Sequence, residues 1–333
     1  MTTTSPVPAV RHYDIKVSNP FVPDGAYKQG LTMVLPRLFQ FLSEGEKHDI
    51  IDNKLRLRHN GADQAQYIQG ACELTICSWF ANQALHTSSR YQYELQVVPP
   101  KDVDCALWYK NIQFNLEVKC ADYRHQNQID AGAGLKVNGF GRLDDFEEFT
   151  ARLAAAMSNA PDPVTVAKAK HMDCKLKDFL LSSQEKFGCH IDPEHLNVLY
   201  VCVDHPMDMQ KWLSYLQGPR GLFTPDSFEP PASYANVDVV VLTNLYHRHH
   251  DLDKKSSLSD HWILEAAFNI AVANPASTKT QRLFAAFAEI APLDNAGLER
   301  FAATLDDLSG KLALSYYANE QISRGIHKFQ GYA

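Results

Sequence analysis

The sequence predicts an α/β fold, with a core sheet of about five strands flanked by helices and with helical additions at both ends. Runs rich in Val, Ile, Leu and aromatic residues, typical of strands, gather in 91–121 and return at 196–203 and 237–243. Apolar residues at helical spacing precede these runs, separate them and follow them. Helices that alternate with strands in this way are typical of an α/β core.

The composition is that of an ordinary globular protein. Of the 333 residues, 45% are hydrophobic and 21% are charged, which suits one large domain or two smaller ones. No stretch approaches a transmembrane helix, and the first residues lack the apolar core of a signal peptide, so we expect a cytoplasmic protein without a membrane partner. The seven cysteines follow no disulfide framework spacing, which fits a reducing compartment. Because the net charge is −7, any surface that binds phosphate must be local.

The first part of the chain is predicted to be helical. A short N-terminal arm leads into 27–59, where Leu31, Val34 and Leu38 recur at helical spacing. A long helix over 62–86 follows the polar break at Asn60-Gly61. Its buried face is predicted to carry Ile68, Cys72, Ile76 and Phe80.

Three strands are predicted next, at 91–98, 103–109 and 112–121. The second and third meet at the polar turn Lys110-Asn111, which favours a hairpin. Alternation in the third strand is clean: the apolar residues Ile112, Phe114, Leu116 and Val118 take one face, and the polar residues Gln113, Asn115, Glu117 and Lys119 take the other.

The remaining elements complete the predicted core. A polar, glycine-containing loop is expected over 122–142, helices over 143–158, 164–187 and 207–217, and strands over 196–203 and 237–243. From residue 258 the pattern predicts helices only, at 258–274, 277–291, 295–309 and 311–325. We therefore divide the chain into an N-terminal arm and helical segment (1–61), a core (62–250) and a helical C-terminal region (251–333).

The hairpin brings together the candidate catalytic and metal-binding residues. Glu117 and Lys119 project from one face of their strand, and Asp104 on the preceding strand can reach them. Mg²⁺ prefers oxygen ligands, which Asp104, Glu117 and the backbone carbonyl of Val118 could supply. Lys119 could then orient or deprotonate an attacking water, or neutralise charge on a phosphate.

Asp104 followed by Glu117-x-Lys119 on the next strand resembles the PD-(D/E)xK nuclease superfamily, which has the restriction-endonuclease-like fold. The proline of that motif is replaced by Val103, with Pro99-Pro100 just upstream. The helix followed by three strands matches the front half of the superfamily's core. The resemblance implies a metal-dependent nuclease that hydrolyses phosphodiester bonds in DNA, as in restriction, repair or phage defence, with Mg²⁺ as cofactor and Mn²⁺ as a substitute.

The resemblance also points to residues around this centre. In the superfamily, the helix before the sheet often adds an acidic metal ligand, and Glu73 is where this chain could supply it. The other interpretation of Glu73 is a helix-flank acid that pairs with a Lys or Arg. Separately from the resemblance, basic residues are in local excess here, and Lys110, Arg124, Lys136 and Arg142 could contact a nucleic-acid backbone; the alternative is a loop that is only solvated. Nothing in the sequence indicates a homodimer.

Two other functions fit parts of the sequence. The first is a non-catalytic nucleic-acid-binding or scaffold protein on the same fold. The second is a metalloenzyme built on the histidines and acids of 247–261, since imidazole and carboxylate suit Zn²⁺ or Fe²⁺. A further set of possible ligands, His171, Cys174, Cys189, His190 and His195, lacks a repeated zinc-site spacing.

Overall fold

The computed structural model describes residues 17–61, 63–121, 135–139, 146–159, 166–170, 172–188, 194–204, 206–218, 220–250 and 260–295. The predicted helices at 295–309 and 311–325 lie almost wholly outside the described residues. Among the described helices, none combines the length and the apolar character needed to cross a membrane.

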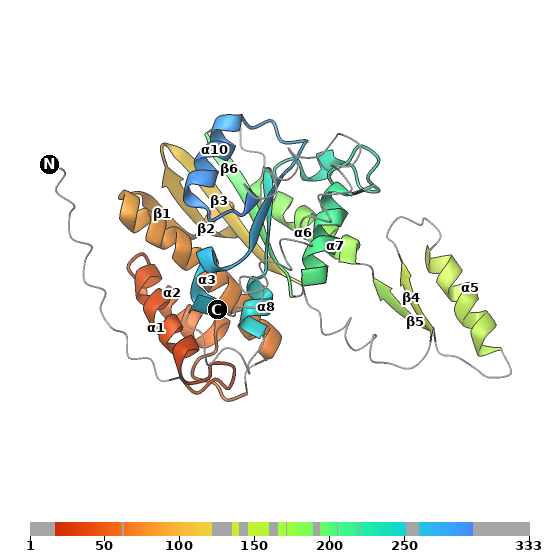
Figure 1. The fold of residues 1–333 in the computed structure, drawn as a ribbon, viewed down its shortest axis with the longest axis horizontal. Helices are drawn as coiled ribbons and strands as arrows, with labels where there is room; N and C mark the ends of the chain where they lie inside the picture. Colours follow the sequence, from red (N-terminus) through yellow and green to blue (C-terminus); the bar gives the residue numbers. More distant parts are fainter. Residues whose placement is uncertain are drawn as a thin grey trace.

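A six-stranded mixed sheet forms the centre of the molecule, in the order β1-β2-β3-β6-β7-β8 (Figure 1). The strands are β1 Arg90–Val98, β2 Lys101–Tyr109, β3 Ile112–Cys120, β6 His195–Cys202, β7 Val239–Thr243 and β8 Asn269–Ala273. β1, β2 and β3 form an antiparallel meander, β6 and β7 run parallel to β3, and β8 returns antiparallel. The α/β class is therefore confirmed, with one more strand than expected.

Helices cover both faces of the sheet. α3 (Gln64–Thr87) packs against β1, β2 and β3, and α6 (Met172–Phe187) packs against β1, β2, β3 and β6. Phe80 of α3 contacts the ring of Tyr200 in β6. Tyr200 is in register with Val118, whereas α6 reaches the neighbouring residue Glu117, so the two helices lie on opposite faces.

α3 is buried nearly all round, although the sequence predicts a single buried face. α1 (Ala26–Phe39) packs on the side of α3 that faces away from the sheet, which buries residues such as Tyr67 and Leu74 as well. The helix begins at Asp63, whose carboxylate accepts hydrogen bonds from the backbone N–H groups of Ala65 and Gln66. A central helix of this kind fixes the residues that it presents to the sheet.

Three predictions of secondary structure were wrong, in the loop 122–142 and in the helices 164–187 and 258–274. The predicted helix 164–187 begins with a strand, β5 (Val166–Lys170), which pairs with β4 (Leu135–Gly139) inside the predicted loop. These strands and α5 (Phe146–Ser158) form a small unit apart from the six-stranded sheet (Figure 1). The predicted helix 258–274 contains two short 3₁₀ helices, η3 (Asp260–Trp262) and η4 (Leu264–Ala266), and then strand β8.

Side chains complete the outer edge of β8. The amide of Asn295 accepts a hydrogen bond from the Ala271 N–H (2.9 Å) and donates one to the Ala271 carbonyl (2.8 Å). Asp294 accepts from the Asn269 N–H and donates its own N–H to the Asn269 carbonyl. Residues 294–295 thus form hydrogen bonds that a seventh strand would otherwise form with β8.

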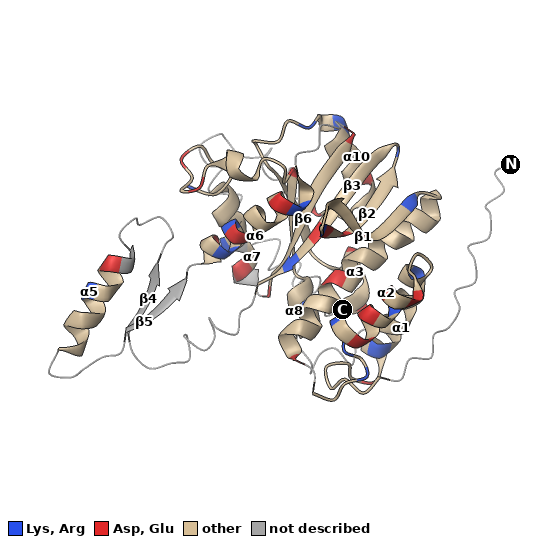
Figure 2. Cartoon of the chain, turned by 180° about the vertical axis from the view of Figure 1, so that it is seen from behind, with Lys and Arg blue, Asp and Glu red and all other residues tan. Residues whose placement is uncertain are grey.

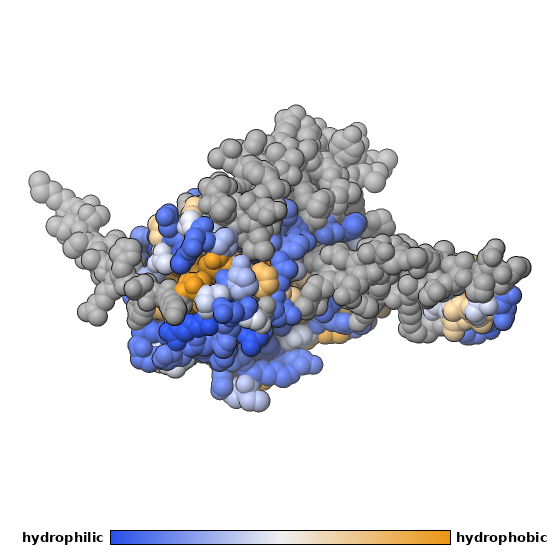
Figure 3. Space-filling view, turned by 90° about the horizontal axis from the view of Figure 1, so that it is seen from below, coloured by the Kyte–Doolittle hydropathy of each residue, from blue (hydrophilic) through white to orange (hydrophobic). Residues whose placement is uncertain are grey.

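One hydrophobic core joins all three parts into which the sequence was divided. It includes Leu31 and Leu35 from α1, Phe80 from α3, and Phe287 from α10 (Gln281–Ile290). The coloured surface in Figure 3 is mainly hydrophilic, and its most hydrophobic residues form a small group near the centre of the view. Residues of both charge signs are spread over the helices seen in Figure 2.

Candidate active site at the β2–β3 divergence

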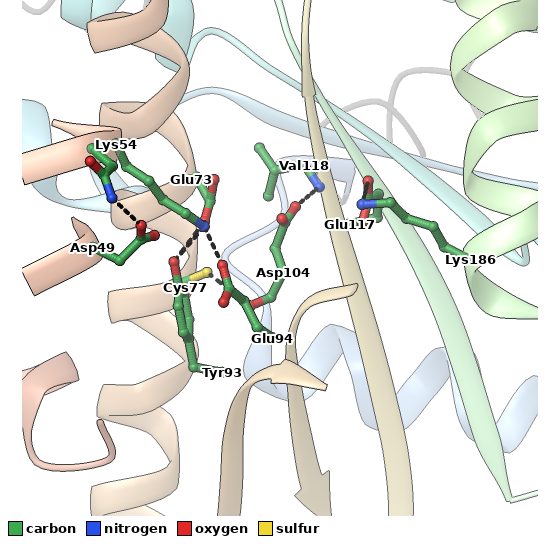
Figure 4. A network of polar contacts seen from close by, with 11 residues as sticks. Asp49, Lys54, Glu73, Cys77, Tyr93, Glu94, Asp104, Glu117, Val118 and Lys186 are labelled. Atoms are coloured by element: carbon green, nitrogen blue, oxygen red, sulfur yellow. Dashed lines mark hydrogen bonds and ion pairs between the residues drawn. The ribbon is translucent and has the colours of Figure 1, made fainter. Parts of the chain in front are cut away.

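The β2–β3 hairpin ends in a side-chain hydrogen bond instead of a backbone one. Antiparallel pairing runs from Tyr109–Ile112 to Cys105–Leu116. Beyond it, the Asp104 carboxylate accepts a hydrogen bond from the Val118 N–H, with Oδ2 2.6 Å from the nitrogen (Figure 4). The Asp104 side chain therefore lies between the two strands, where they separate.

Glu117 is held beside this point by two lysines. Its side chain is 1% exposed, and its Oε1 lies 2.7 Å from Nζ of Lys119 and 2.7 Å from Nζ of Lys186 on α6. The predicted proximity of Glu117 and Lys119 is therefore observed. Burial alone would lower the pKa of Lys186, but the Glu117 carboxylate outweighs it and raises that pKa. Charge pairing makes the burial of Glu117 tolerable.

Among the described residues, no lysine contacts Asp104 directly, and its pKa is raised well above the usual value. Burial is the main cause, followed by the negative charges of Glu73 and Glu117. Lys186 and the hydrogen bond from Val118 oppose the shift without cancelling it. Asp104 lies between these two acids in Figure 4, and the negative charge of each disfavours its ionisation.

Glu73 belongs to a separate network on the α3 side. Its Oε1 accepts from Nζ of Lys54 at 2.5 Å and from the hydroxyl of Tyr93 at 2.9 Å. Lys54 also lies 2.6 Å from the Glu94 carboxylate. Of the two interpretations of Glu73, the pairing with a lysine is the one observed, while its charge still acts on Asp104.

Unusual backbone positions this second network. Lys54 ends a π-helix, η1 (Asp49–Lys54), a form that occurs frequently at functional sites. Glu94 has a left-handed φ of 45°, next to an irregularity in the β1–β2 pairing. The first distortion lies where Lys54 reaches Glu73, and the second lies where Glu94 reaches Lys54. Burial would lower the pKa of Lys54, but Glu73 and Glu94 outweigh it and raise that pKa.

Some of the oxygen atoms near the point where β2 and β3 separate are placed to bind a hard cation, and others are not. Oε2 of Glu117 is buried and has no hydrogen-bond partner among the described residues, which is unusual for a carboxylate. The Val118 carbonyl lies on the same side of β3 as its N–H, toward Asp104, because both groups of one residue share a side in an extended strand. Asp104, Glu117 and Val118 could hold Mg²⁺, whereas Glu73 first has to release Lys54.

The predicted nucleic-acid contacts are not gathered around this centre. Lys110 lies in the turn at the other end of the hairpin, six residues or about 20 Å along β2 from Asp104, and pairs with Glu289. Lys136 is on β4, of which only the backbone is described. Arg124 and Arg142 lie outside the described residues.

Two lysines of the site were not predicted from the sequence. Lys186 comes from a helix 69 positions after Glu117, and Lys54 from the end of the predicted helical segment. Neither position carries a local pattern. The only available signal was that buried acids require cationic partners.

The histidine cluster is divided among separate contacts. His249 lies between the hydroxyls of Tyr27 (2.8 Å) and Thr75 (3.0 Å), and His261 contacts the Arg248 carbonyl. His247 and His250 flank Asp204; burial opposes their effect, but they lower the pKa of Asp204 to about 2. Of the second predicted set, only Cys174 and His195 are among the described residues.

Within the described residues, the single group of three or more His, Cys, Asp or Glu side chains arranged to hold a metal is a cysteine cluster, Cys72, Cys120 and Cys202. Comparison with protein-family models, curated proteins and solved structures gives no match, so the assignment of function depends on the geometry of the chain itself.

Proposed function

We propose that this chain is a metal-dependent nuclease that hydrolyses phosphodiester bonds in DNA, with a restriction-endonuclease-like core. The observation that carries the proposal is the convergence of Asp104, Glu117 and Lys119 where β2 and β3 separate. The order of α3 and the antiparallel β1–β3 meander also supports it, because this order matches the front half of the core of the PD-(D/E)xK superfamily.

Each side chain has a role in this proposal. Asp104 and Glu117 supply carboxylate oxygens, and Val118 supplies a carbonyl. Lys119 provides an ammonium group that can neutralise charge on a phosphate oxygen. Lys186 on α6 pairs with the Glu117 carboxylate and holds it in place. When bound, Mg²⁺ or Mn²⁺ supplies Lewis-acid activation of phosphate and water.

One observation favours a second candidate, a non-catalytic nucleic-acid-binding or scaffold protein on the same fold. Glu117 already has two ammonium groups within 2.7 Å, and Glu73 is paired with Lys54. These lysines compensate the acids without a metal. In this case the polar centre stabilises the fold and takes no part in a reaction.

Cleavage and binding of the same labelled DNA separate the two candidates. Wild type, Asp104→Asn, Lys119→Ala and Lys110→Ala are compared on plasmid, linear duplex and RNA, with Mg²⁺, Mn²⁺ or a chelator. A nuclease loses at least about 100-fold in rate with Lys119→Ala but keeps much of its affinity for DNA. Lys110→Ala removes the same charge from the far end of the hairpin and should leave the rate unchanged.

Asp104→Asn should remove metal binding and with it the metal-dependent cleavage, because an amide is a poorer ligand for a hard cation than a carboxylate. If the wild type binds DNA and cuts nothing with any divalent metal, the scaffold candidate is correct. If it neither binds nor cuts nucleic acid, both candidates are wrong.

A further inference from the structure

Three cysteines from three separate elements converge at one place under α3. They are Cys72 in α3, Cys120 at the end of β3 and Cys202 at the end of β6, and their Sγ atoms all lie within 4.8 Å of one another. Cys120 and Cys202 face each other in the parallel register of β3 and β6. Cys72 and Cys202 are fully buried, and Cys120 is half-buried.

The cluster borders a cavity of about 340 Å³. Cys120 lines this cavity together with Gln66 and Gln69 of α3 and Tyr246 of α8 (Leu245–His250). Cys77 and Cys105 also lie between α3 and the sheet but are not part of this group of three, and they behave as ordinary small hydrophobic residues. The group of three thiols, one of which lines an accessible cavity, is therefore distinct from the other described cysteines.

We propose that Cys72, Cys120 and Cys202 form a binding site for a thiophilic metal ion, with Zn²⁺ as the ion of choice. Thiolates select Zn²⁺ and similar ions over Mg²⁺. Zn–S bonds of about 2.3 Å in a tetrahedral site place the sulfurs about 3.8 Å apart, so a contraction of at most about 1 Å closes the observed cluster around the ion. Binding releases the thiol protons to solvent as the three Zn–S bonds form.

The cavity supplies the fourth position. No fourth Cys, His, Asp or Glu of the described residues joins the three sulfurs, so the remaining ligand is a water or a small molecule that enters through the cavity. A site with three protein ligands and an open position exchanges its ligand, unlike a closed structural site. The ion would also join the ends of β3 and β6, one residue after Lys119.

The test uses the full chain, purified under reducing conditions and supplied with Zn²⁺ or Co²⁺ alone. After removal of free metal, we expect one Zn²⁺ per chain by elemental analysis. With Co²⁺ we expect the thiolate charge-transfer band and the visible bands of a tetrahedral site. Neither measurement requires nucleic acid, so failure here is distinct from failure of the proposed nuclease.

Variants locate the site. Cys120→Ala and Cys202→Ser should each lower the affinity for Zn²⁺ at least about 10-fold and weaken the Co²⁺ charge-transfer band, because one of the three thiolates is lost. The matched control is Cys105→Ser, a buried cysteine on the same face of the sheet that should keep both signals. Thermal melts verify that Cys120→Ala, at a half-buried position, is folded. Retention of less than one Zn²⁺ per chain, or equal retention by Cys120→Ala and the control, overturns the proposal.

Discussion

At the scale of single residues, the candidate site contrasts two buried acids. Glu117 is compensated by Lys119 and Lys186, whereas the closest polar contact of Asp104 is a backbone N–H. The same removal of charge should therefore have opposite effects at the two positions. This difference can be measured without any substrate.

Without divalent metal, Asp104→Asn should raise the free energy of unfolding at pH 7 by roughly 0.5–2 kcal/mol. Burial and two neighbouring acids raise the pKa of Asp104, so between the unfolded pKa and the folded pKa the native state binds the additional proton and loses stability as pH rises. The amide oxygen of Asn can still accept from Val118. The gain should shrink as pH falls toward about 4, where Asp104 is protonated in both states, as denaturant melts at several pH values would record.

Glu117→Gln is the comparison for that measurement, and it should lower the free energy of unfolding at pH 7 by about 1–3 kcal/mol, because two partly buried lysines lose their counter-charge. The raised pKa of Lys186 contributes stability fully below about pH 10.4, and this contribution is lost as pH rises through the folded pKa. The deficit should therefore persist from neutral pH to about pH 10. Equal shifts of the same sign in both variants would contradict this account.

At the scale of elements, the packing of the π-helix against α3 depends on one glycine. A Cβ at Gly70 would lie 2.7 Å from the Lys54 carbonyl oxygen and 3.0 Å from its carbon, both of which belong to the backbone of η1. Gly→Ala inside a helix normally stabilises by about 1 kcal/mol. Here the steric clash should prevail, because backbone cannot rotate away as a side chain can.

We therefore expect Gly70→Ala to lower the free energy of unfolding by roughly 1–3 kcal/mol. The control is Gly61→Ala, where a Cβ would meet nothing within 4 Å, and its effect should stay within about 0.5 kcal/mol. Chemical denaturation of the three proteins measures both values. A stabilised Gly70→Ala would mean that η1 does not approach α3 as closely as described.

The elements that the sequence predicted well are those with a strong local pattern. The alternation from Ile112 to Lys119 gives β3 and its faces, and the turn Lys110-Asn111 gives the hairpin. β5 and β8 were missed because they are short and depend on pairing with distant strands. In β5, the sequence Val-Ala-Lys-Ala-Lys also contains good helix formers, which favoured a helical interpretation.

The residues of the candidate site also divide into those that a local pattern predicts and those that only tertiary packing brings in. Asp104, Glu117 and Lys119 lie on one hairpin, so strand periodicity was sufficient to bring them together. Lys186 and Lys54 reach the acids only through tertiary packing of α6 and η1. Glu73 shows most clearly how far the sequence could predict the site, because its position on a helix was predicted and its partner Lys54 was not.

At the scale of the whole molecule, the shared core predicts cooperative unfolding. Tyr27 of α1 contacts Tyr67 of α3 and His249 of α8, and its carbonyl accepts a hydrogen bond from Trp262 of η3. These contacts span all three regions into which the sequence was divided. Independent domains would share no such core.

Tryptophan fluorescence and far-UV circular dichroism should therefore give coincident denaturant transitions. The four tryptophans lie in separate elements, at Trp79, Trp108, Trp212 and Trp262, so fluorescence samples the molecule widely. Two resolved transitions in the fluorescence curve would show that part of the core unfolds independently.

The outer edge of β8 has a consequence for the behaviour of the protein at high concentration. An open strand edge is a template on which another chain can add a strand, and aggregation begins at such edges. Asn295 and Asp294 occupy the backbone groups of Ala271 and Asn269 that a neighbouring molecule would need. At the opposite end of the sheet, the irregular pairing and left-handed Glu94 of β1 make a poor template as well. The sheet is thereby protected at both ends against growth from one molecule to the next.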